Sequence, residues 1–405
     1  MGAMCAAWLP ALFSTLLAGV AWPEAGDSLL EQIRVRMAET LRHIPDYTCL
    51  QTIERWRQGD PCAKCQYRER LRLEVAVIGG KERWAWPGAR EFEDRGLEQI
   101  VPPGAIGTGD FSGFATTIFR TPAASFQGPY PEVLEGRAAW RYDYAVPVER
   151  SRYTVRDGRH SAVVGFHGAF WVSRDTLDLL RLDVSADGLP TPPLDIASAT
   201  TTISYQRTRI GESSFLLPRL SELSLSSLSE RASRNRTTFT DCRQYVGQVT
   251  LRFDEAVSAG EATGPAVSQT RLPAGLTLEL SLETPFDPAR AAAGDVIEAR
   301  LVRDVRRDGR LLAPKGARVH GRLRTVRQYL VPRSLGVLEL ELTRLQAPGL
   351  EAELRARLEW LGGIVAGARR RDDVVVSSSD KESAILFNGP LLRLPRGFRM
   401  QWRTL

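Results

Sequence analysis

The sequence predicts a mainly β protein, with a curved antiparallel half-barrel carrying a leading helix, followed by a small β-barrel or sandwich domain. Apolar residues recur at helical spacing near the N-terminus and then alternate with a period of two along most of the chain. A small, polar stretch separates the strand-like segments into two sets. The chain has 405 residues, of which 43% are hydrophobic and 25% charged, so we expect a globular protein of two domains.

The first 21 residues read as a targeting segment. The apolar run from Leu9 to Ala21 is too short for a comfortable transmembrane helix. It ends in small residues, Ala18 to Ala21, which suit a signal peptidase, although no Lys or Arg precedes it. We expect residues 1–21 to be a signal peptide, with a buried N-terminal helix as the alternative. The mature chain would then be periplasmic or associated with the outer envelope, without a transmembrane span.

A helix is predicted directly after this segment. Apolar residues fall on one face from Leu29 to Ile44, at spacings of three and four. Ser28 and Glu31 have the spacing of a capping box, and Pro45 cannot continue a helix. We expect the helix to begin at Ser28 and to end before Pro45.

The half-barrel domain is assigned to residues 28–254. After the helix, the alternation of apolar and polar residues predicts strands, whereas residues 101–136 are rich in Gly and Pro and carry one short helix at Gly113–Arg120. The strands are predicted at 47–57, 71–77, 140–148, 162–172, 177–186, 201–210, 215–225 and 237–253. Together they form a long antiparallel meander that is wide enough to curl.

Residues 255–270 are predicted to be a linker, and residues 271–405 a small β-barrel domain. The linker is small and polar, and the strands beyond it are predicted at 277–282, 296–302, 317–326, 335–342 and 351–360. The pattern Arg271-Leu-Pro-Ala-Gly275 returns as Arg393-Leu-Pro-Arg-Gly397, each time before a strand. We expect the first and last of these strands to lie together, as closure requires; chance recurrence is the alternative.

One strand of the first domain carries a family resemblance. The segment Phe170–Leu182, "FWVSRDTLDLLRL", resembles a recurring strand of the LolA/RseB-like lipoprotein-carrier superfamily, and the layout of residues 28–254 is similar to that family. The resemblance implies a curved half-barrel covered by helices, whose apolar concavity holds lipid chains or a partner protein. Residues 101–136 would then serve as a lid or an insertion.

The second domain resembles a shortened relative of the VirB10/TrbI-type β-barrel domain. The residues that carry this resemblance are Leu272–Gly275, Gly294–Val305 and Asp308–Leu323. Those proteins are structural components of secretion machinery. The resemblance implies a barrel and an envelope location, and it does not imply a secretion channel, because the chain shows no long proline-rich region.

Four cysteines remain if the signal peptide is removed, and three pairings are open to them. Cys62 and Cys65 lie at the tip of a hairpin, where a structural disulfide, a redox pair and half a zinc site are the alternatives. The sequence that follows reads as strand rather than helix, which favours the structural disulfide. Cys49 lies in the first strand of the meander and Cys242 in the last, so a bridge between them requires the sheet to bring those strands together.

The sequence offers no catalytic, cofactor or metal site. It has no Gly-x-Ser-x-Gly motif, the glycines of Gly107–Gly113 lack the Lys-Ser/Thr of a phosphate loop, and its four histidines lack the spacing of zinc ligands. We therefore expect no enzyme activity and no cofactor; a carbohydrate-active hydrolase with unidentified carboxylates is an alternative. The net charge of +6 is spread among arginines that cluster only at Arg369–Arg371, so no nucleic-acid partner is expected.

Five aromatic residues are candidates for a ligand cleft. Trp84 and Trp86 share one face of a strand, and Trp140, Tyr142 and Tyr144 share a face of another. They serve either core packing or the lining of an apolar cleft. The sequence thus predicts a non-enzymatic envelope protein that binds a lipid, a lipoprotein or an envelope partner on its concave face. The alternative is a ligand-free structural adaptor whose concave face is filled by its own side chains.

Overall fold

A computed structural model describes residues 25–59, 64–89, 91–92, 96–101, 107, 113–157, 160–229, 231–245, 269–362, 373–378 and 383–405. The predicted signal peptide, Cys62, Arg369–Arg371 and nearly all of the predicted linker lie outside these residues. None of the helices in the described ranges is long and apolar enough to cross a membrane.

The elements follow one another as helix first and strands afterwards. The helices are α1 (Ala25–His43), α2 (Leu97–Ile100), α3 (Gly113–Arg120) and the 3₁₀ helix η1 (Val148–Arg150). The strands before the predicted linker are β1 (Tyr47–Gln58), β2 (Gln66–Ile78), β3 (Lys81–Ala85), β4 (Ser125–Leu134), β5 (Arg137–Val146), β6 (Thr154–Arg156), β7 (Ser161–Val163), β8 (Phe166–Ser173), β9 (Leu179–Ala186), β10 (Ser198–Ile210), β11 (Ser213–Ser226) and β12 (Ala232–Gln244). Those after it are β13 (Gln269–Arg271), β14 (Thr277–Leu282), β15 (Val296–Leu301), β16 (Val305–Arg307), β17 (Arg310–Ala313), β18 (Arg318–Val331), β19 (Leu335–Ala347), β20 (Leu350–Glu353), β21 (Ala356–Gly362), β22 (Val374–Ser378), β23 (Ser383–Phe387) and β24 (Arg399–Thr404).

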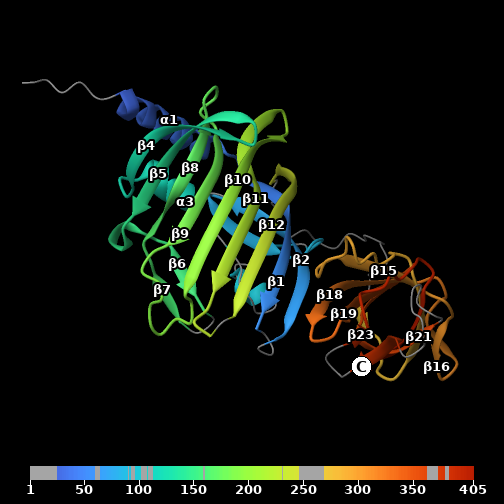
Figure 1. Ribbon diagram of the computed structural model, residues 1–405. Coiled ribbons are helices and arrows are strands. Elements are labelled where there is room, and N and C mark those ends of the chain that lie inside the picture. The colour runs from blue at the N-terminus through green and yellow to red at the C-terminus, as the bar shows by residue number, and fades with distance from the viewer. Residues whose placement is uncertain are drawn as a thin grey trace, which may run out of the picture.

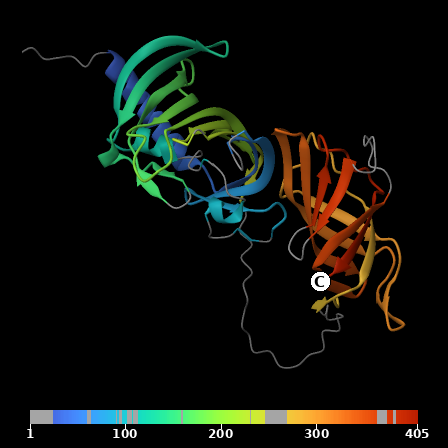
Figure 2. The same cartoon turned by 60° about the horizontal axis from the view of Figure 1, so that its bottom comes forward.

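The N-terminal strands form a long antiparallel sheet. Its strands run in the order β4, β5, β8, β9, β10, β11, β12, β1, β2 and β3, each paired antiparallel with the next. The sheet curves around α1 and α3, which lie on its inner side (Figures 1 and 2). The predicted fold class, mainly β with a curved antiparallel sheet and a leading helix, is confirmed.

The leading helix packs the predicted apolar face on the sheet. Ile33 and Met37 are fully buried and belong to the same cluster as residues of α3 and of the sheet. The helix ends before Pro45, as predicted, but it begins at Ala25, so Ser28 lies inside it. The predicted capping box is therefore wrong.

Three parts of the N-terminal sheet differ from the predicted strands. Strand β4 was not predicted, because Gly128, Pro129 and Pro131 interrupt its pattern; proline is tolerated there because β4 is an edge strand. The strand expected at 162–172 is two strands, β7 and β8, separated at Val164 and Gly165. The last strand, β12, begins earlier than predicted, since the first residues of its buried face, Ser233, Asn235 and Thr237, are polar and hide the alternation.

The C-terminal strands surround a second core. β18 pairs with β15 and β19, β15 with β14, β14 with β24, and β24 with β21. Leu278, Leu280 and Trp402 are fully buried in this core. Leu278 lies opposite Trp402, so the strands that follow the two "RLP-x-G" segments do lie side by side, as predicted. The strand expected at 351–360 is two strands, β20 and β21.

The two sets of strands join at β2. The end of β18 pairs with the start of β2, where Tyr329 lies opposite Tyr67 and Arg327 opposite Glu69. The C-terminal strands therefore lie directly beside β2, as both overall views show (Figures 1 and 2). The predicted division into two domains at residues 255–270 stays a prediction, because that segment lies almost wholly outside the described residues.

Candidate ligand site beneath α3

An aromatic cluster occupies the inner face of the sheet. Tyr142 on β5 lies opposite Phe170 on β8, and their rings stack with centroids 5.3 Å apart. Tyr144 and Phe166 lie on the same face, with ring centroids 6.0 Å apart. Because side chains on one strand alternate between faces, the spacing of two that was read from Tyr142 and Tyr144 places both rings inside.

Gly168 makes room for one of these rings. It lies opposite Tyr144, whose hydroxyl donates a hydrogen bond to the Asp183 carbonyl at 2.8 Å. A Cβ on Gly168 would stand only 1.9 Å from that carbonyl oxygen. Burial, with smaller contributions from Tyr205 and Asp183, raises the pKa of Tyr144 well above its usual value. The ring is therefore a neutral, hydrogen-bonded part of the cluster.

Helix α3 closes the cluster from the inner side of the sheet. Its buried residues are Phe114, Ala115, Ile118 and Phe119. The Phe114 ring meets Phe166 at 5.6 Å, and the Phe119 ring meets Phe170 at 4.9 Å, both edge to face. The helix thus inserts two aromatic rings among those of the sheet. The sequence predicted this helix at the right residues but did not reveal which face it would cover.

The polar attachments of α3 gather at its C-terminal end. Arg34 of α1 donates from Nη2 to the Thr121 carbonyl at 3.5 Å, and Arg150 of η1 donates from Nη1 to the Pro122 carbonyl at 2.8 Å. Cations are favoured at the C-terminal end of a helix, where carbonyls lack helical partners. Along its length α3 is held by apolar packing, and these two arginines hold its end.

The five candidate aromatic residues do not form one site. Trp140 is half-buried against the cluster of Tyr142 and Tyr144, and the Arg174 guanidinium lies 4.0 Å from its ring centroid. Trp84 belongs to a second cluster, with its indole N–H donating to Gln51 at 3.1 Å. The structure therefore brings Trp140, Tyr142 and Tyr144 together beneath α3 and places the other two elsewhere.

Trp86 lies where the N-terminal sheet meets the C-terminal strands. A Cβ on Gly294 would lie 2.7 Å from its ring, and the Arg322 guanidinium lies 5.6 Å from its ring centroid. This tryptophan therefore packs against residues that are more than two hundred positions away in the sequence.

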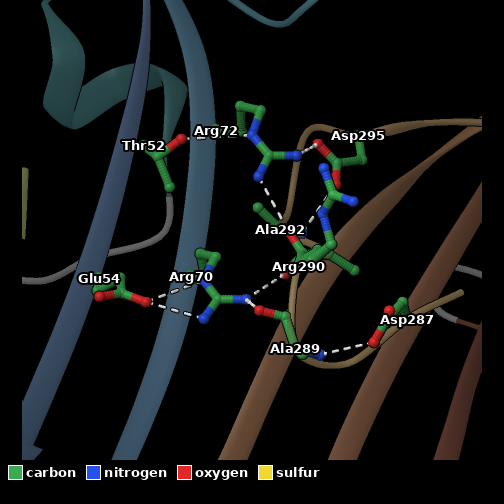
Figure 3. Close-up of polar contacts among 10 residues, drawn as sticks. Thr52, Glu54, Arg70, Arg72, Asp287, Ala289, Arg290, Ala292 and Asp295 are labelled. Atoms are coloured by element: carbon green, nitrogen blue, oxygen red, sulfur yellow. Dashed lines mark hydrogen bonds and ion pairs between the residues drawn. The ribbon is translucent and has the colours of Figure 1, made fainter. Parts of the chain in front are cut away.

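The same junction is fixed by two arginines of β2 (Figure 3). Arg70 donates to Glu54 on β1 and to the carbonyls of Ala289 and Ala291. Arg72 pairs with Asp295 at 2.5 Å and donates to the Arg290 carbonyl at 2.9 Å. The backbone of Ala293 bonds to that of Arg70 and Arg72. The 287–295 segment is therefore bound along the edge of β2.

A buried ion network completes the junction. Glu69 pairs with Arg55 at 2.7 Å and with Arg327 at 2.9 Å, and the Arg55 and Glu69 side chains are 0% and 2% exposed. Burial lowers the pKa of Arg55. Burial also lowers the pKa of Arg327, but the Glu69 carboxylate outweighs it, and the net shift is upward. No local sequence pattern revealed this network.

The disulfide between Cys49 and Cys242 is present, with Cα atoms 4.1 Å apart, and the two residues are 193 positions apart in the sequence. It joins β1 to β12, which are neighbours in the sheet. Cys65 is also disulfide-bonded, whereas Cys62, its predicted partner, lies outside the described residues. Within the described ranges, no group of three or more His, Cys, Asp or Glu residues could hold a metal ion.

Comparisons with known proteins give a distant likeness. No family model and no curated protein matches the chain. A DUF1329 family protein from Desulfovibrio piger matches with 11% identity over 54% of this chain and 93% of its own, at a TM-score of 0.26. A LolA superfamily protein from Nitrosomonas europaea matches with 11% identity over 54% of this chain and 94% of its own, at a TM-score of 0.25. The chain is thus similar to both structures at a level that carries no argument about its function.

Proposed function

We propose that this protein is a non-enzymatic, exported envelope protein that holds an apolar chain, from a lipid or a lipoprotein, between α3 and the inner face of the N-terminal sheet. The observation that carries the proposal is the way α3 is held. Two phenylalanine rings of a short amphipathic helix fill the aromatic cluster, so an acyl chain in their place would keep the rings of the sheet covered.

The proposed location rests on the disulfide. A bridge between Cys49 and Cys242 is typical of proteins that fold in an oxidising compartment, and rare in the cytosol. A predicted signal peptide at residues 1–21 agrees with export. The proposal places the protein in the periplasm or at the outer envelope.

A ligand-free structural adaptor is the second candidate. The observation in its favour is that the inner face is already filled, with Phe170 fully buried among the rings of β5 and α3. The junction at β2 would suit such a role, since it holds the C-terminal strands in one orientation. In this case α3 would be an ordinary part of the core.

A binding measurement on Phe119→Ala separates the two candidates. If a chain must displace α3, a weaker helix raises the binding-competent fraction of molecules. We expect cis-parinaric acid, measured by fluorescence, to bind Phe119→Ala about tenfold more tightly than the natural protein, for a loss of about 1.4 kcal/mol of helix packing. Phe387→Ala is the matched control, because Phe387 is equally buried in the C-terminal core.

Three outcomes decide. Tighter binding by Phe119→Ala, with no such gain in Phe387→Ala, supports the carrier. Absence of binding in all forms, together with a lipid-free mass in native mass spectrometry of the full chain, overturns it in favour of the adaptor. Weaker binding by Phe119→Ala contradicts displacement of α3.

A further inference from the structure

We infer that the apolar chain bears an anionic, phosphate-type headgroup, which Arg34 and Arg150 bind in place of the C-terminal carbonyls of α3. This inference rests on the proposed function, since it concerns the same site. It assigns a chemical class to the ligand and a binding role to two arginines that come from different elements, α1 and η1.

The two arginines already hold neighbouring oxygen atoms. Arg34 donates to the carbonyl of Thr121 and Arg150 to that of Pro122, which are consecutive residues. If α3 moves away to admit an acyl chain, these carbonyls leave with it. Both guanidinium groups would then face the vacated end of the aromatic cluster with free donors. Phosphate oxygens suit such donors, because guanidinium N–H groups bind them with charge-assisted hydrogen bonds.

Arg34 has unused donor capacity in the closed state as well. Its Nε atom is buried and has no hydrogen-bond acceptor among the described residues. A buried N–H without an acceptor is costly, and it would gain one from an anion at the position of the Thr121 carbonyl. In the described part of the chain, the carboxylate within ion-pair distance of Arg34 is that of Glu31, at 3.6 Å, on the exposed side of α1. Arg34 and Arg150 therefore leave a net positive charge at this end of the cluster.

The order of contacts along the chain also suits a ligand that replaces both the apolar and the polar contacts of α3. Phe119 lies in the aromatic cluster and Thr121 only two residues further along the chain, so the apolar and the polar contact are adjacent. A single-chain phospholipid has the same order, with an acyl chain joined through glycerol to a phosphate. The chain would take the place of the Phe rings, and the phosphate that of the carbonyls.

Two probes with the same acyl chain test this inference. Lysophosphatidic acid and monoolein, both oleoyl esters, differ in the phosphate, and their binding to the full chain is measured by tryptophan fluorescence. We expect the phosphate probe to bind at least about tenfold more tightly, and this advantage to shrink as salt is raised. Inorganic phosphate alone serves as a third probe and competitor, because it shows whether the arginines recognise the anion without a chain.

Variants of the two arginines give the decisive reading. In Arg34→Gln and in Arg150→Gln, the ratio of the two affinities should fall about tenfold, and the Lys variants should recover part of it. Arg310→Gln, at an exposed position of β17, should leave the ratio as it is. The ratio corrects for any loosening of α3 that the loss of a carbonyl contact causes, since loosening affects both probes alike.

Failure of this inference differs from failure of the proposed function. If monoolein and lysophosphatidic acid bind equally and the arginine variants do not change the ratio, the headgroup assignment is wrong while the apolar site stands. If neither lipid binds the natural protein, the proposed function itself is wrong. Competition by inorganic phosphate against lysophosphatidic acid, but not against monoolein, would support the arginine site directly.

Discussion

Glu69 is the residue on which the junction between the two sets of strands depends. Its carboxylate is almost fully buried and pairs with Arg55 of the neighbouring strand and with Arg327 from the other end of the chain. The Tyr67 and Tyr329 rings lie beside it, tilted by 50° with their centroids 5.3 Å apart, and the Arg327 guanidinium lies 4.8 Å from the Tyr67 ring centroid. The carboxylate is thus enclosed by side chains from both parts of the molecule.

Replacement of this carboxylate should be strongly destabilising. In Glu69→Gln, two guanidinium groups lose their counter-charge, and one of them is fully buried, so we expect the free energy of unfolding in urea to fall by about 3 to 5 kcal/mol. The matched control is Glu212→Gln, whose carboxylate is 97% exposed in its pair with Arg209, and which should change it by less than about 1 kcal/mol. Equal effects of the two changes would contradict the role given to Glu69.

At the scale of elements, the outer face of β4, β5, β8 and β9 carries a row of aromatic and arginine side chains. Tyr130, Arg141, Trp171 and Arg181 lie directly opposite one another on successive strands. The Trp171 ring lies between two guanidinium groups, at 5.8 and 5.1 Å. Glu132 of β4 accepts hydrogen bonds from Trp171 at 2.7 Å and from Arg141 at 3.1 Å, so the edge strand is tied to β8 through it.

This row makes the attachment of β4 sensitive to acid. The hydrogen bonds from Trp171, and then from Arg141, lower the pKa of Glu132. A carboxyl group with a lowered folded-state pKa contributes stability above its unfolded pKa, and that stability is lost as the pH falls through the folded value. We expect Glu132→Gln to be less stable than the natural protein at pH 7 and to approach it in acid. Urea unfolding from neutral to acidic pH checks this, and a constant difference between the two would refute it.

The elements show what the sequence could predict and what it could not. Strand β1 and helix α3 were predicted to within a residue, because their apolar pattern is set by what they bury locally. Strand β4 was missed, since its prolines are acceptable only at a sheet edge, and edges are a property of the whole sheet. Tyr142 and Tyr144 were placed on one face by their spacing, but nothing in their neighbourhood announced Phe119 of α3.

The contacts between β2 and the C-terminal strands could not be predicted from local sequence patterns either, because they join distant parts of the chain. Glu69 and Arg327 are 258 positions apart, and each alone reads as a charged residue on a strand. Trp86 was likewise assigned to a ligand cleft because its spacing from Trp84 fixes a strand face. Its neighbours are Gly294, in the turn before β15, and Arg322 on β18, and the spacing of two tryptophans cannot identify contacts so distant in the sequence. The arginine at position 34 gave no sign of its contact with the end of α3.

For the whole molecule, the bridge between Cys49 and Cys242 closes nearly all of the N-terminal sheet into one loop. A cross-link over 193 positions restricts the unfolded chain more than it restricts the folded one. We expect Cys242→Ser to lower the free energy of unfolding by about 4 to 5 kcal/mol on the chain-entropy model. Differential scanning calorimetry of the oxidised natural protein and the variant measures this.

The control is a reductant strong enough to open disulfides, added to both proteins; because Cys65 is also disulfide-bonded, the natural protein and Cys242→Ser should unfold alike only when both are reduced. A count of free thiols on the non-reduced, unfolded protein should find neither Cys49 nor Cys242. Free thiols at both positions would contradict the disulfide and, with it, the proposed export.

The two ends of the N-terminal sheet are protected from other chains by different means. β4 carries Pro129 and Pro131, which cannot donate to an added strand. β2 has no proline. Its free edge is covered from start to end by three segments, namely β18, the segment around Ala293 and β3. Loss of the chain after Tyr245 would therefore uncover a row of unpaired backbone groups on β2. We expect a shortened protein to aggregate through that strand, because the C-terminal strands would no longer cover it.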